Sequence, residues 1–165
     1  MPAHKPAQTQ ILDAIHAHLL NITAENGYSA TLRKIVRAGL KPFKSADMPS
    51  INYWPGGDVL LEELPGKQLR ELEINIEFYD RHGEQPLTDR ALELASDAHL
   101  ALWRSINAPK VEDQPESRLG GIVDSFTFQS VQPAIGEGQS PFCGAVISLT
   151  VRYRVSADNP FQLVN

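Results

Sequence analysis

The fold is decided by a nine-residue stretch in the middle of the chain, which reads ELEINIEFY over residues 71–79. Apolar and polar side chains alternate strictly through it, and the apolar ones are Leu72, Ile74, Ile76 and Phe78. This alternation predicts a β-strand with one buried side and one side that faces solvent. The strand therefore belongs to an antiparallel or mixed sheet that is covered on one face.

Other strands are predicted around it. Residues 145–155 alternate in the same way and predict the longest strand of the chain. Residues 50–54 are rich in Ile, Tyr and Trp, residues 122–132 centre on two phenylalanines, and residues 31–40 indicate a short or irregular strand. Proline and glycine separate these segments, so we expect a loop or hairpin arm over 58–64 and a long loop over 133–144.

The first of two predicted helices runs over residues 10–25. Its apolar residues Ile11, Ile15, Leu19 and Ile22 recur at intervals of four, four and three. Thr9 is the expected N-cap. The pair Asn26-Gly27 supplies a left-handed residue that ends a helix.

The second predicted helix begins with Thr88 as its cap and ends near Asn107, before Pro109. Its small alanines allow it to lie close against a sheet. Leu94 and Trp103 are expected to flank a core stripe that consists of Ala91, Leu92, Ala95, Ala98, Leu102 and Ile106.

These elements predict a single α+β domain over residues 1–165, with flexible termini at 1–8 and 157–165. Its architecture is two-layered: a mixed or antiparallel sheet of four to five strands, covered on one face by two helices. A length of 165 residues suits one domain with one core.

Composition excludes several classes of protein. A protein that grips DNA phosphates carries an excess of basic residues, whereas this chain has a formal net charge of −5. No apolar run approaches the roughly 20 residues that span a bilayer, so we expect no membrane contact. The single cysteine, Cys143, precludes an internal disulfide framework and is expected to be a small buried hydrophobe.

No catalytic or metal-binding set is recognisable in the sequence. His16 and His18 are two residues apart on a helix, so they point to different sides and cannot share one ion. The glycine pairs lack the Lys-Ser/Thr that follows a phosphate loop. We therefore predict no enzyme activity, no metal and no cofactor.

Three groups of residues are candidates for a subunit or partner interface. The basic stretch contributes Arg37, Lys41 and Lys44, which in the simpler interpretation form only a solvated surface. An apolar arm over residues 48–65 either contacts a partner or folds onto its own core, and it contributes Tyr53, Trp54, Leu60 and Leu61. The acidic side of the central strand contributes Glu71, Glu73 and Glu77, whose simpler role is to keep the strand soluble.

The chain resembles the tail terminator proteins of long-tailed phages, a family of minor tail proteins. The resemblance covers most of the chain and depends on patterns that lie in order along it: Leu19-Leu20-Asn21-Ile22, Asn26-Gly27-Tyr28, Pro49-Ser50-Ile51, the strand 71–79, the helix 92–106 with Asp97 in its middle, and Val151-Arg152-Tyr153. The chain differs from smaller members in its long C-terminal segment and in the loop 113–117.

The resemblance implies a structural virion protein with no active site. Such a protein forms a hexameric ring at the head-proximal end of the tail tube, stops tail polymerisation and presents the surface that joins the head. Its implied partners are copies of itself, the tail tube protein and a head-completion or connector protein. DNA passes through the ring without specific binding, and assembly takes place in the host cytoplasm.

Two alternatives remain open from the sequence. One is a neighbouring head–tail or tail completion adaptor, which shares the small α/β design. The other is a small hydrolase or ligand-binding domain, which requires a concave pocket with converging titratable groups.

Overall fold

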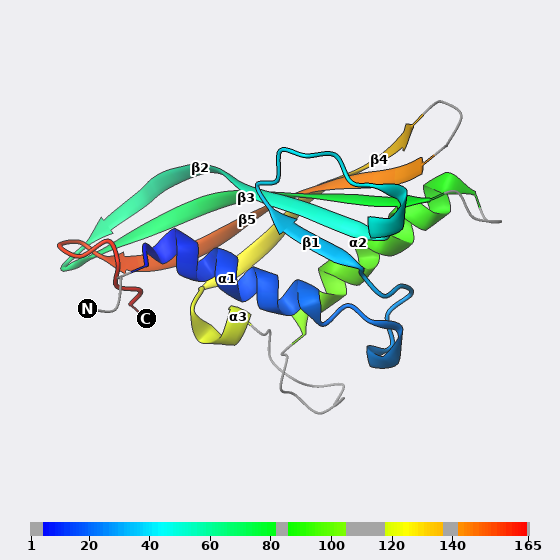
Figure 1. Cartoon of the computed structure of the whole chain (residues 1–165). Helices are drawn as coiled ribbons and strands as arrows, with labels where there is room; N and C mark the ends of the chain where they lie inside the picture. Colours follow the sequence, from blue (N-terminus) through cyan, green and yellow to red (C-terminus); the bar gives the residue numbers. More distant parts are fainter. Residues whose placement is uncertain (1–4, 82–85, 105–117, 137–141, 165) are drawn as a thin grey trace.

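The computed structural model describes residues 5–81, 86–104, 118–136 and 142–164. Its centre is a five-stranded sheet in the order β1-β2-β3-β5-β4 (Figure 1). The strands are β1 (Lys34–Arg37), β2 (Ser50–Leu64), β3 (Lys67–Arg81), β4 (Ser125–Gly136) and β5 (Phe142–Ser156). β1 runs parallel to β2, and the other neighbouring pairs are antiparallel, so the sheet is mixed.

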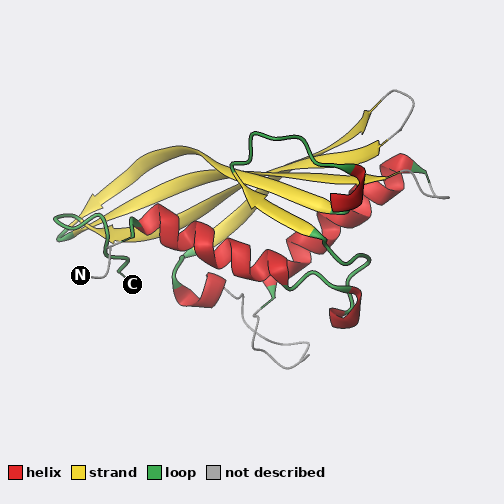
Figure 2. Cartoon of the chain, in the orientation of Figure 1, coloured by secondary structure: helices red, strands yellow, loops and turns green. Residues whose placement is uncertain are grey.

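Two long helices, α1 (Ala7–Leu20) and α2 (Leu87–Trp103), lie on the same face of the sheet (Figure 2). The predicted two-layer α+β architecture is therefore confirmed. The remaining helical segments are single turns, namely η1 (Ala24–Asn26), η2 (Ser45–Asp47) and α3 (Arg118–Gly121). None of the helices in the described part of the chain is long and apolar enough to cross a membrane.

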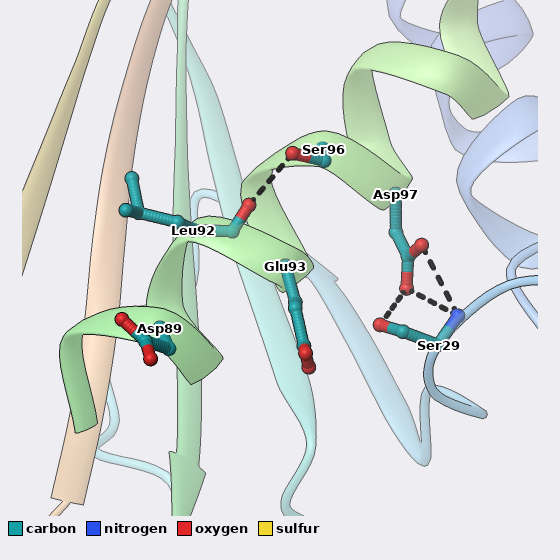
Figure 3. A pocket seen from close by; sticks show the side chains of 6 residues that line it. All are labelled: Ser29, Asp89, Leu92, Glu93, Ser96 and Asp97. Atoms are coloured by element: carbon teal, nitrogen blue, oxygen red, sulfur yellow. Dashed lines mark hydrogen bonds between the residues drawn. The ribbon is translucent and has the colours of Figure 1, made fainter. Parts of the chain in front are cut away.

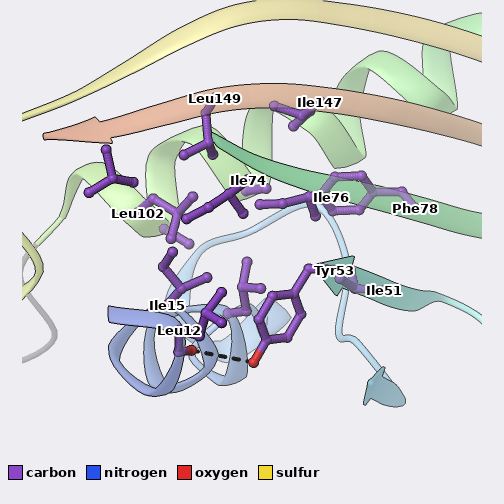
Figure 4. Packing of buried hydrophobic residues seen from close by; sticks show 14 of the residues in the cluster. Leu12, Ile15, Ile51, Tyr53, Ile74, Ile76, Phe78, Leu102, Ile147 and Leu149 are labelled. Carbon is purple, nitrogen blue, oxygen red and sulfur yellow. Dashed lines mark hydrogen bonds between the residues drawn. The ribbon is translucent and has the colours of Figure 1, made fainter. Parts of the chain in front are cut away.

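The core lies between the helices and the inner face of the sheet (Figure 4). The alternation that predicts β3 is confirmed, because its apolar residues are buried and its glutamates lie on the opposite side. β5 lies beside β3 and contributes a second row of side chains to the same core, including Ile147, Leu149 and Val151. These two central strands thus supply the floor on which both helices pack.

The second strand is longer than expected. β2 continues from Ser50 through Pro55 and two glycines to Leu64, so of the two alternatives for 58–64 the hairpin arm is confirmed and the loop is wrong. Its pairing with β3 shifts between Pro55 and Asp58, which is a bulge. A bulge accommodates a proline that cannot donate to a ladder, so the proline does not end the strand.

Close packing explains one of the two glycines. A Cβ atom added at Gly56 would lie 2.8 Å from the Glu73 carboxyl carbon, whereas one at Gly57 would meet nothing within 4 Å. The side chain of Glu73 therefore crosses over the bulge at Gly56.

The fourth strand also extends further than predicted. β4 begins at Ser125 and continues through Pro133 to Gly136, so part of the expected loop over 133–144 is strand. Proline is tolerated there because β4 lies at the edge of the sheet. Residues 142–144 of that expected loop belong to β5, and residues 137–141 lie outside the described residues, as does the loop 113–117.

The predicted limits of the first helix are wrong. α1 begins at Ala7 after Pro6, not after Thr9, and it ends at Leu20. The amides of Asn21 and Ile22 donate to carbonyls only three residues back, which tightens the last turn and ends the helix early. Gly27 adopts the predicted left-handed conformation, with φ of 85°, but it closes η1.

Most of the predicted core stripe of the second helix is confirmed, since Ala91, Ala95, Ala98 and Leu102 are buried, but Leu92 and Leu94 exchange roles. Leu94 is buried with four alanines and Leu102, whereas Leu92 is 46% exposed. The buried positions follow the spacing of three and four residues that one helical face requires. The helix starts at Leu87 rather than after a Thr88 cap, it ends at Trp103, and Ile106 lies outside the described residues.

The C-terminal segment is held in place. The Val164 amide donates to the Arg154 carbonyl at 3.0 Å, and the Ala7 amide donates to the Pro160 carbonyl at 3.2 Å. Leu163 also forms a bridge with Val155. The expectation of a loose tail over 157–165 is therefore wrong for these residues, which continue the sheet edge in line with β4.

Candidate interaction surfaces

The outer face of the sheet, opposite the helices, is partly covered by the connection from β1 to β2. This connection crosses above the sheet as the cyan loop in Figure 1. The Phe43 ring lies 5.5 Å from the Tyr79 ring, and the Gly39 amide donates to Asn52 Oδ1 at 2.9 Å. A groove of about 380 Å³ remains between the loop and the sheet, and its lining includes Lys41, Phe43, Met48, Asn52, Glu77 and Tyr79.

This groove brings two candidate groups together. Lys41 from the basic stretch and Glu77 from the acidic side of the central strand line the same hollow. The Tyr79 hydroxyl donates to Glu77 Oε2 at 2.6 Å. Burial, and then the Glu77 carboxylate, raises the pKa of Tyr79 to about 12, so the phenol stays protonated at neutral pH.

The rest of the basic stretch is partly neutralised within the chain. Arg37 Nη1 lies 2.9 Å from Asp13 Oδ1 on α1, and Lys34 Nζ lies 3.0 Å from Asp47 Oδ2. Hydrogen bonds from Lys5 first, and then from Arg37, lower the pKa of Asp13 despite its desolvation. Lys44 is exposed like Lys41, and its backbone amide donates to Asp47. The stretch therefore offers less free positive charge than its composition indicates.

The acidic candidates all lie on the outer face, as predicted, but their surroundings differ. Glu71 Oε2 lies 2.9 Å from Arg152 Nε on β5. Glu73 crosses over Gly56, and Glu77 accepts from Tyr79. The three side chains are half-buried by these neighbours, so this face is a mixed polar surface.

One part of the apolar arm folds onto the core of the chain, and another part is exposed and could contact a partner. Tyr53 is 1% exposed, its hydroxyl donates to the Leu12 carbonyl at 3.3 Å, and it also contacts His16 Nδ1 (Figure 4). Its place among the surface candidates is therefore wrong. Trp54 is half-buried on the outer face. Further along β2 the arm becomes exposed, at Val59, Leu60 and Leu61.

A surface that the sequence did not indicate lies at the opposite edge, between α2 and β4. His99 stacks on Phe128 with ring centroids 3.8 Å apart, and Trp103 meets Phe126 edge-on at 5.4 Å. Trp103 is 40% exposed. We call these four residues the aromatic flank; the exposed Leu92 and Val131 lie on the same helix and strand. The sequence indicated Phe126 and Phe128 on a strand and Trp103 on a helix, but not that these elements bring them together.

A second hollow lies beside α2 and is lined by Ser29, Asp89, Leu92, Glu93, Ser96 and Asp97. Figure 3 shows Asp97 and Ser29 pointing toward each other at one side of it. Asp97 accepts from the Ser29 hydroxyl at 2.6 Å and from the Ser29 amide at 3.0 and 3.1 Å. Its carboxylate thus fixes the connection before β1 onto α2, which is a structural role.

Other side chains that could take part in catalysis or metal binding also have structural contacts within the fold. His18 is buried, with Nδ1 2.9 Å from the Ala101 carbonyl oxygen, whereas His16 faces Tyr53. Cys143 is buried as predicted, and burial raises the pKa of its thiol. Within the described ranges, no group of three or more His, Cys, Asp or Glu side chains could hold a metal ion.

A scan against protein-family models and a search of curated proteins found no match to this chain. The function is therefore inferred from its surfaces and from the resemblance of its sequence patterns.

Proposed function

We propose that the chain is a structural subunit of a phage virion. It forms a ring at the head-proximal end of the tail tube, stops tail polymerisation and presents the surface that joins the head. Its partners are copies of itself, the tail tube protein and a head-completion or connector protein. The ring is hexameric by resemblance to the tail terminators, and it assembles in the host cytoplasm.

One observation carries this proposal: exposed apolar residues lie at both lateral edges of the sheet. Leu60 and Leu61 are 41% and 43% exposed on β2, and Trp103 is 40% exposed beside β4. Contacts between copies in a ring are heterologous, which requires two different patches on each subunit. Exposed apolar patches of this kind are typical of protein–protein contacts.

The charge distribution is compatible with a ring through which DNA moves. The chain carries a net charge of −5, and the ion pairs of Arg37 and Arg152 reduce its free positive charge. Binding of DNA phosphates depends on clustered Lys and Arg side chains. A lumen without clustered basic side chains would let the genome pass without being held.

Deletion of the gene from its phage, followed by electron microscopy, tests the proposal. Loss of a terminator gives overlong tails, because nothing halts the tube. Tails of normal length that lie free of full heads would instead identify a completion adaptor. Normal, infectious particles would contradict both assignments and favour a small enzyme or ligand-binding domain.

A further inference from the structure

Among the residues that the structure describes, no further strand pairs with either lateral edge of the sheet at the level of the β2 bulge. Asp58, Leu72, Val151 and Phe126 are paired across four strands and form one continuous row from β2 to β4. β1 pairs with β2 only over 50–53, so among the described residues no strand lies along the outer side of β2 over 54–64. β4 is the last strand at the other end of the row.

The directions of the two edge strands would also allow two copies to pair. Each neighbouring pair from β2 to β4 is antiparallel, so β2 and β4 run in opposite directions. A copy displaced sideways along the row therefore places its β4 antiparallel to β2 of the next copy. No shift along the strands is needed. The contact is head-to-tail, which is the type that forms a ring when each copy is also rotated relative to the last.

The two edges carry apolar side chains at that level. The β2 edge presents Val59, which is 59% exposed, together with Leu60 and Leu61. The other edge presents the aromatic flank, with Trp103 packed edge-on against Phe126. Burying both surfaces against each other removes apolar area from water.

Charge favours the same pairing. Glu62 and Glu63 follow the apolar residues of the β2 edge, are exposed, and make no ion pair within the described part of the chain. Arg104 follows Trp103, is exposed, and rests 5.8 Å from the Tyr28 ring. It too has no carboxylate partner among residues 5–81, 86–104, 118–136 and 142–164. Carboxylates therefore lie beside one apolar patch and a guanidinium beside the other, which suits contact between two copies.

We propose that the β2 edge of one subunit, residues 54–64, packs against the aromatic flank of the next subunit. Leu60 and Leu61 meet Trp103 and Phe126, and the carboxylates of Glu62 and Glu63 face Arg104. This inference rests on the proposed function and names the two halves of its ring contact.

Cross-linking of paired cysteines tests this contact. Val59 and Ser125 occupy the two ends of one row, through Glu71 and Arg152. A chain that carries both Val59→Cys and Ser125→Cys is treated with a short bis-maleimide under conditions in which the protein assembles. We expect a ladder of covalent dimers, trimers and higher multimers on a denaturing gel.

Each single-cysteine variant is the matched control, because a heterologous contact keeps copies of the same residue apart. At about 4.8 Å between strands, identical sites repeat on the order of 20 Å from one another. Cys143 is buried, so the unaltered chain should not react. Circular dichroism of each variant checks that the fold is retained.

The outcomes separate this inference from the proposed function. Rings seen by native mass spectrometry without a covalent ladder would overturn the contact and leave the ring. Covalent dimers from either single variant would show a two-fold contact and overturn it as well. A chain that stays monomeric at every concentration, with and without tail tubes, would overturn both.

A double substitution on the β2 edge tests whether loss of its apolar residues weakens the contact. Leu60→Glu with Leu61→Glu should weaken self-association by about tenfold or more, because two charges replace the apolar patch. The same change at a distant exposed leucine, Leu20→Glu, should leave it unchanged. Equal association of all three proteins would contradict the proposed contact.

Discussion

The hydroxyl of Tyr153 on β5 donates a hydrogen bond of 2.9 Å to Oδ2 of Asp58, at the bulge of β2. Gln8 Nε2, on α1, donates to the same oxygen at 2.6 Å, and Arg70 Nε lies 3.3 Å from the carboxylate. Burial, and then the Asp58 carboxylate, raises the pKa of Tyr153, so its hydroxyl remains a donor. One carboxylate therefore joins the first helix to three strands at the base of the projecting hairpin.

Tyr153→Phe should lower the free energy of unfolding by about 1 kcal/mol, since one hydrogen bond is lost and Asp58 keeps two donors. Asp58→Ala should cost about 3 kcal/mol, because it leaves three donors without their acceptor. Chemical denaturation measures both values. In the Asp58→Ala background the Tyr153→Phe change should have almost no effect, and full additivity would show that the two residues are not coupled.

Two matched leucine-to-alanine substitutions test which side of α2 faces the core. Leu94→Ala should destabilise the protein by about 2–4 kcal/mol, because it leaves a cavity in the core. Leu92→Ala should change stability by less than about 0.5 kcal/mol, because that side chain is largely exposed. Similar losses in the two variants would contradict the observed orientation of the helix.

His18 should make stability depend on pH. Burial lowers the pKa of His18, and the backbone carbonyls of Ala101 and Arg104 oppose this effect. The unfolded chain therefore takes up a proton at a pH where the folded chain does not, so stability is full above the unfolded pKa of 6.5 and falls as the pH drops below it.

Denaturation at pH 7.5 and pH 5.5, values on either side of that ordinary histidine pKa, measures this dependence. His18→Gln should reduce the difference in unfolding free energy between the two conditions. His16→Gln is the control, since His16 is only half-buried. A pH dependence that survives His18→Gln unchanged would assign the effect to other groups.

The two glycines of the β2 bulge should respond differently to alanine. At Gly56 the added Cβ would press on Glu73, so Gly56→Ala should cost on the order of 1 kcal/mol. Gly57→Ala meets no atom within 4 Å and should be neutral or stabilising by up to about 1 kcal/mol. Thermal unfolding of the two variants distinguishes them, and equal effects would argue against the close crossing of Glu73.

The sequence predicted the layered fold because alternation and helical spacing are local properties. β3 and β5 were recognisable from alternate apolar residues, and both helices from apolar residues three and four apart. Element limits were less predictable. Pro55 indicated a strand end, yet the bulge at that position let β2 continue, and that depends on pairing with β3.

The candidate surfaces were harder to predict than the fold. Tyr53 and Leu60 belong to the same predicted apolar arm, and only the position of α1 determines that the first is buried and the second exposed. The aromatic flank joins Trp103 and Phe126 from separate elements, so no local pattern could indicate it. The groove that joins Lys41 to Glu77 likewise depends on where a loop crosses the sheet.

The central claim is that this chain assembles into a closed ring that ends a tail tube. Native mass spectrometry of the full-length protein, alone and mixed with tail tubes, tests it most directly. The account predicts one discrete oligomer, a hexamer of the 18.2 kDa subunit, either in solution or released from the tube ends. A protein that remains monomeric under both conditions would contradict it.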